Sequence, residues 1–148
     1  MGELLVCVDF SDASDRVITA AVRLAASTNL TLRVIHVAAS ESELAGYDNE
    51  SFEATTPDKR AGALRDEHAT LEAITDRLRT AGIDAADPAI VMGHTAKEIV
   101  RLAHDSDAEL IMVGSHGHGG IHHLLVGSVT EDLLRHSSVP VIVVPVRQ

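Results

Sequence analysis

Short, unbroken apolar runs alternate with longer amphipathic stretches along the chain, and this alternation restricts the possible folds more than any other feature. The apolar runs predict strands at Leu4–Asp9, Leu32–Ala38, Ala89–Met92, Leu110–Val113 and Val139–Val146. The amphipathic stretches predict helices at about Asp12–Ser27, Asp58–Ala81 and Thr95–His104, and a last one from near Ser128 to before Pro140. Because unbroken runs indicate strands covered on both faces, we expect an α/β fold, with an open five-stranded parallel sheet and helices on both faces.

Size and charge narrow the class of protein. A chain of 148 residues with 45% hydrophobic composition suits a single domain, residues 1–148, which needs no disulfide or structural metal. The formal net charge of -10 removes the attraction that drives general nucleic-acid and anionic-membrane binding, so neither is an expected partner. The surplus of acids with few lysines fits a halophile or a GC-rich genome.

The compartment is expected to be the cytoplasm. The N-terminus lacks the basic region of a signal peptide, and no apolar run approaches the roughly 20 residues of a membrane span. Cys7, the single cysteine, is expected to be a small buried hydrophobe. Residues 39–57 are acidic and break the alternation, and we expect a solvated, mobile loop, either a tolerated insertion or a functional lid.

The stretch from Gly114 to Thr130 carries the strongest chemical signal. It leaves the end of a predicted buried strand, where ligands bind in open α/β sheets, and enters a helix near Ser128. Its glycines allow close approach of the backbone to a ligand, and a helix start presents free N–H groups and a positive dipole end. These features favour a phosphate-binding loop. Two alternatives need no ligand: the stretch is simply a long connecting loop, and Ser128 serves with Glu131 as a capping box for its own helix.

Two common nucleotide motifs are missing from the sequence. A P-loop requires a lysine after its glycines, and neither Lys59 nor Lys97 follows such a loop. The dinucleotide fingerprint belongs after the first strand, where Asp9–Asp12 stands instead. The sequence therefore supports neither a Walker-type ATPase nor a dinucleotide-dependent dehydrogenase.

The glycine spacing resembles the nucleotide-binding motif of the universal stress proteins, G-x2-G-x9-G-S/T. Gly114, Gly117, Gly127 and Ser128 occupy its fixed positions. Three further segments look like the family's first, second and last strands: Val6–Ser11, Val34–Val37 and Val139–Pro145. The resemblance thus extends over essentially the whole chain.

The resemblance implies a Rossmann-like sheet with strand order 3-2-1-4-5, which brings Asp9 opposite the loop at Gly114. It implies that ATP binds there with Mg²⁺ or Mn²⁺, with Asp9 on the sugar side and the backbone of Val37 recognising adenine. The expected nucleotide-binding residues are Asp9, Phe10, Val37, Met112, Gly114, Ser115, His116, Gly117, His118, Gly127, Ser128, Val129 and Thr130. For Asp9 a local alternative is a helix-entry residue.

The resemblance also implies a homodimer, made by pairing the last strands. Val141–Val146 would otherwise be an exposed hydrophobic edge. The expected function is a stress-response module that binds adenine nucleotide and changes its partner contacts. No evident general base or arginine finger is present, so the chain is expected to be at most a weak ATPase.

Four histidines cluster in the loop: His116, His118, His122 and His123. Imidazoles bind transition metals, but the loop lacks cysteines and carboxylates, which favours solvated residues near phosphates over a metal site. The alternatives to nucleotide-dependent regulation are slow ATP hydrolysis, metal binding by these histidines, and a nucleotide-free interaction module.

Overall fold

The computed structural model describes residues 2–38, 57–92, 95–115 and 128–145. Within them the chain forms β1 (Glu3–Val8), α1 (Asp12–Ser27), β2 (Thr31–Ala38), α3 (Pro57–Thr80), β3 (Ala89–Met92), α4 (Thr95–Asp105), β4 (Ala108–Gly114), α5 (Ser128–His136) and β5 (Val141–Val144). Every predicted strand and helix is present. The acidic segment at 39–56 lies outside the described residues.

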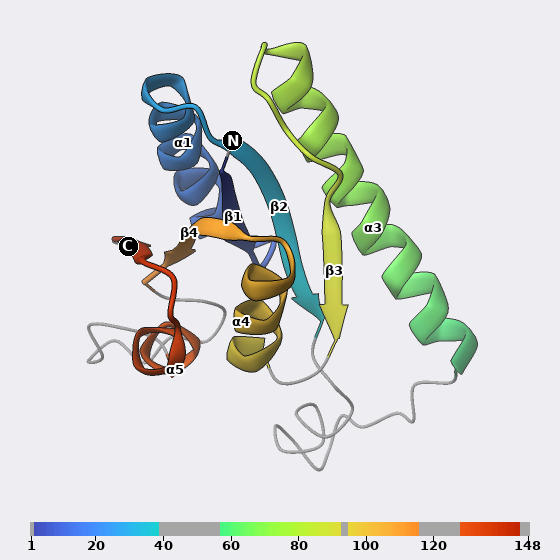
Figure 1. Ribbon diagram of the computed structural model, residues 1–148. Coiled ribbons are helices and arrows are strands. Elements are labelled where there is room, and N and C mark those ends of the chain that lie inside the picture. The colour runs from blue at the N-terminus through green and yellow to red at the C-terminus, as the bar shows by residue number, and fades with distance from the viewer. Residues whose placement is uncertain (1, 39–56, 93–94, 116–127, 146–148) are drawn as a thin grey trace.

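The strands form one five-stranded sheet, parallel throughout, in the order β3-β2-β1-β4-β5. This confirms the predicted fold class and strand order. The chain moves outward from β1 to β3 and then returns to the other side of β1 as β4, so the order switches between β1 and β4. Figure 1 shows β2 between β1 and β3, with the long α3 helix beside β2 and β3.

Side chains alternate between the two faces of the sheet and fill two cores. The first core contains Leu4, Val6 and Val34 and is covered by α1 and α3 through residues such as Val17 and Leu71. The second contains residues of the opposite face and is covered by α4 and α5; its buried members are Leu5, Ile35, Ile99, Ala103, Ala108, Ile111, Val113 and Leu133. Both faces are therefore covered, as the unbroken apolar runs predict.

Cys7 packs against the second core and is partly buried. Burial raises the pKa of its thiol to about 12, because the thiolate would lose its hydration. The prediction of a small hydrophobe in the sheet is therefore close to what the structure shows. No helix among the described residues has the length and apolarity needed to cross a membrane.

The last strand is shorter than the sequence predicts. Val139 lies in a turn in which its N–H donates to the Ser137 hydroxyl at 3.1 Å, and that hydroxyl donates to the Val139 carbonyl at 2.7 Å. Pairing with β4 starts at the Pro140 carbonyl, which accepts from the Ile111 N–H at 3.0 Å. The strand therefore begins after Pro140, since the turn occupies the residue before it.

Candidate functional site

The predicted site lies at the carboxyl edge of β1 and β4, where the strand order switches. Val6 of β1 is in register with Met112 of β4, so the two strands end side by side. Asp9 directly follows β1, and Ser115 directly follows β4. Helix α1 begins just after β1, and the first turn of α5 is bonded to the end of β4 through Thr130 and Gly114, so both helices start near this edge.

The Asp9 carboxylate accepts hydrogen bonds from residues at the start of α1. Its Oδ1 accepts from the Ser11 backbone N–H at 2.9 Å, from the Ser11 hydroxyl at 2.5 Å and from the Ser14 hydroxyl at 3.1 Å. The Asp9 N–H in turn donates to the Ser14 hydroxyl at 3.2 Å, and Ser14 is buried. These bonds fit the alternative in which Asp9 serves as a residue at the entry to helix α1. They also fix the direction of the carboxylate at the edge of the sheet.

Phe10 adopts a left-handed backbone conformation with φ 64°, which is uncommon for a residue with a side chain. Its ring stacks on His36 of β2, with ring centroids 4.3 Å apart and an interplanar angle of 29°. The His36 Nδ1 lies 3.0 Å from the Val8 carbonyl, and its Nε2 lies 3.7 Å from Oε2 of Glu67 on α3. Three elements thus meet around one imidazole.

Sequence reasoning missed His36 and Glu67 at this edge. A signal for His36 was available, because Leu32 and Val34 alternate onto the face covered by α1 and α3, and period two places His36 on that face as well. No comparable signal marked Glu67. It reaches the edge only because α3 packs against β2.

The start of α5 is fastened to the end of β4. The Thr130 hydroxyl donates to the Gly114 carbonyl at 3.0 Å, and Thr130 is only 4% exposed. The Ser115 N–H donates to the Val144 carbonyl at 2.9 Å, and Ser115 is buried as well. With the hydroxyl hydrogen of Thr130 engaged, Thr130 can still offer its backbone N–H to an anion, as other residues of the first turn can.

The remaining predicted residues are placed differently. Met112 is buried in the first core, two residues before the end of β4, whereas Val129 is exposed on the first turn of α5. Val37 contributes backbone near the end of β2, in register with Val91. His116, Gly117, His118 and Gly127 lie outside the described residues, and Ser128 is described only as the first residue of α5.

The histidine cluster also lies outside the described residues, so the metal-binding alternative stays a hypothesis. Among the residues that the structure describes, no group of three or more His, Cys, Asp or Glu side chains could hold a metal ion. Carboxylates described near the edge include Asp9, Asp12 and Asp15 at the start of α1 and Glu67 of α3.

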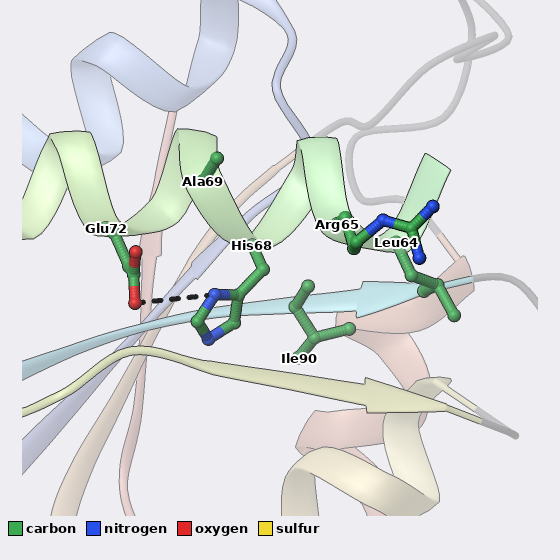
Figure 2. Close-up of a pocket in the computed structure, with 6 residues that line it drawn as sticks. All are labelled: Leu64, Arg65, His68, Ala69, Glu72 and Ile90. Carbon is green, nitrogen blue, oxygen red and sulfur yellow. Dashed lines mark ion pairs between the residues drawn. The ribbon is translucent and has the colours of Figure 1, made fainter. Parts of the chain in front are cut away.

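A separate groove of about 460 Å³ lies between α3 and the edge strand β3. Figure 2 shows its lining, Leu64, Arg65, His68, Ala69 and Glu72 of α3 and Ile90 of β3. His68 and Glu72 form an ion pair at 3.4 Å across one turn of the helix. None of the predicted nucleotide-binding residues that the structure describes lines this groove.

Comparison with known proteins identifies relatives over the whole chain. The universal stress protein YxiE of Bacillus subtilis is 31% identical over 150 residues, which cover 96% of this chain and 97% of YxiE. The universal stress protein MJ0577 of Methanocaldococcus jannaschii is 39% identical over 74 residues, covering 50% of this chain and 45% of MJ0577. The segment that matches the Synechocystis universal stress protein Slr1230 spans 18% of that protein.

Solved structures share the fold. The structure of MJ0577 superposes with a TM-score of 0.79 at 28% identity and covers 99% of this chain and 97% of its own. A universal stress protein crystallised in complex with cAMP superposes with a TM-score of 0.66 at 26% identity, covering 97% of this chain and 95% of its own. The model of the universal stress protein family matches residues 1–145. Together with the full-length similarity to YxiE, this match shows that the chain belongs to the universal stress protein family.

Proposed function

We propose that the protein binds an adenine nucleotide, ATP together with Mg²⁺ or Mn²⁺, at the carboxyl edge of β1 and β4. The observation that carries the proposal is the switch in strand order between β1 and β4, with Asp9 directly after β1 and α5 fastened to the end of β4 through Thr130 and Gly114. Ligands of open α/β sheets bind at such points. The relative that was crystallised with cAMP supports the same class of ligand.

In this proposal the first turn of α5 receives the phosphates. Its backbone N–H groups and positive dipole end suit an anion, and the glycines of the preceding loop, with Gly114 first, allow close approach. The Asp9 carboxylate accepts hydrogen bonds from the sugar hydroxyls, while the backbone of Val37 contacts adenine. In this arrangement the phosphate oxygens face backbone N–H donors, and the sugar hydroxyls face a carboxylate acceptor.

The proposal requires a cation. The chain has no Lys or Arg between Gly114 and Arg135, and the first turn of α1 carries the exposed residues Asp12 and Asp15. These carboxylates would repel a triphosphate, whereas Mg²⁺ would neutralise it and prefers oxygen ligands. We therefore expect ATP to bind much more weakly without the divalent cation.

We propose regulation by binding, with slow ATP hydrolysis as the alternative. Asp9 accepts bonds from an amide and two hydroxyls at the start of α1, which suits a group that orients a ligand more than a general base. Bound nucleotide would then alter contacts with protein partners in a stress response. Steady release of phosphate that Asp9→Ala abolishes would favour the enzymatic alternative.

The decisive experiment asks what the protein binds. We expect adenine nucleotide in the supernatant of heat-denatured protein, and stabilisation by MgATP of roughly 5–10 °C at about a hundred-fold excess over Kd. Asp9→Ala should reduce this shift, whereas the control Asp76→Ala on the exposed side of α3 should keep it. A clean supernatant together with no stabilisation by MgATP would refute the proposal.

We further propose that two chains pair through the last strand, Val141–Val146. The four residues of β5, Val141–Val144, are all half-buried at an edge of the sheet. The carbonyls of Pro140 and Val144 face β4, so by alternation the N–H and C=O groups of Val141 and Val143 face outward. Val143→Pro should leave the β4 ladder intact and convert a dimer into a monomer, as measured by light scattering. A wild-type monomer would contradict the pairing.

A further inference from the structure

The turn between β1 and α1 needs support from elsewhere in the fold. Phe10 occupies the left-handed region with φ 64°, a conformation that glycine adopts easily and an aromatic residue rarely does. The described contacts of its ring are with the first core and with His36. The conformation of this turn therefore depends in part on how firmly the His36 ring is held.

His36 is held from two sides. Its Nδ1 lies 3.0 Å from the Val8 carbonyl, and its Nε2 lies 3.7 Å from Glu67 Oε2. That carboxylate oxygen is buried and has no hydrogen-bond partner among the described residues, so the imidazole is the group that it faces. The side chain of His36 is only 12% exposed. The ring is therefore bonded to β1, stacked on Phe10 and adjacent to Glu67 of α3.

The conformation of this turn also fixes the position of the Asp9 carboxylate. Phe10 lies between Asp9 and Ser11, and the Ser11 N–H donates to Asp9 Oδ1 at 2.9 Å. If Phe10 left the left-handed region, the Ser11 N–H would point elsewhere and this bond would break. We propose that His36 is a positioning residue, which through its stack on Phe10 holds the Asp9 carboxylate in the direction that the nucleotide site requires. The consequence for nucleotide affinity rests on the proposed function above.

The first test needs no nucleotide. Hydrogen exchange of the Ser11 amide, followed by NMR, reports the bond to Asp9 directly. In His36→Ala we expect this amide to exchange about ten-fold faster, which is the change that corresponds to losing one aromatic stacking interaction. His68→Ala is the matched control, because His68 is an exposed histidine of α3 that forms its own ion pair with Glu72. It should leave the Ser11 amide unchanged.

Further variants separate positioning from a general loss of structure. His36→Phe keeps a ring over Phe10 and should retain most of the protection of Ser11, and it remains informative if His36→Ala does not fold. In a Phe10→Gly background the turn no longer depends on the stack, so adding His36→Ala should have little further effect. A Ser11 amide that is unaffected by His36→Ala, or an equal effect in the glycine background, would overturn the inference.

The second test measures MgATP affinity by calorimetry. His36→Ala should weaken it about ten-fold relative to the wild type and to His68→Ala. An unchanged affinity would overturn the link between His36 and the nucleotide site. If the wild type does not bind MgATP at all, the proposed function fails, and the Ser11 amide alone then decides whether His36 positions Asp9.

Discussion

Replacing Ser14 by alanine tests how firmly Asp9 is attached to the start of α1. The Ser14 hydroxyl donates to Asp9 Oδ1 at 3.1 Å and accepts from the Asp9 N–H at 3.2 Å, and the residue is only 7% exposed. A partly buried hydrogen bond to a carboxylate contributes about 1.5 kcal/mol, and the loss of an acceptor for the N–H costs about 1 kcal/mol. Alanine offsets about 0.5 kcal/mol of this loss, because its helix propensity is higher than that of serine.

The net effect should be a loss of about 2 kcal/mol in the free energy of unfolding, or roughly 4–8 °C in Tm. Urea denaturation followed by circular dichroism measures it. Ser27→Ala is the control on the same helix, because its exposed hydroxyl only bonds to main-chain carbonyls of the last turns, such as that of Leu24 at 3.0 Å, and it should change stability by less than about 0.5 kcal/mol. Equal losses in the two variants would refute the assignment of Asp9 and Ser14 as one hydrogen-bonded unit.

Three further perturbations address the rest of the molecule. Thr130→Val should destabilise the protein by about 1 kcal/mol, measured by urea denaturation, because the partly buried Gly114 carbonyl loses its donor. Leu133→Ala should cost about 3 kcal/mol in the same assay, since the side chain is fully buried, whereas the half-exposed Leu134→Ala should cost little. The Cys7 thiol has its pKa raised from 9.0 to about 12, so the unfolded chain ionises first. The stability from this group is therefore complete below about pH 9 and decreases toward pH 12, and Cys7→Ala should flatten that part of the pH profile.

The sequence predicts the fold well because the signals for it are local. Gly82 illustrates this: it was expected to end the second helix, and it has φ 85° just after α3 ends at Thr80. The Ile83 N–H donates to the Leu78 carbonyl at 3.0 Å across this turn, as in a Schellman motif. A single residue without a side chain thus sets a helix boundary that can be predicted from the sequence.

The site is less predictable because its details depend on tertiary contacts. The sequence places Asp9 after a strand, but the left-handed Phe10 and its stack on His36 depend on how β1 and β2 align. Glu67 is 31 positions from His36 in the sequence and approaches it only through the packing of α3. Thr130 was predicted as a nucleotide-binding residue, which stays a prediction, and the bond from its hydroxyl that joins α5 to β4 was not foreseen.

The two helix starts at the carboxyl edge of β1 and β4 differ in charge, and this difference supports a direction for the proposed nucleotide. The positive end of α1 is already compensated by Asp9 and by Asp12 and Asp15 of its first turn. In α5 the one first-turn acid, Glu131, is paired with Arg135 at 2.7 Å. The α5 start is therefore the less compensated of the two and suits phosphates, while the carboxylate-rich α1 start suits hydroxyl donors and a cation. A nucleotide bound the opposite way would place its phosphates against three carboxylates.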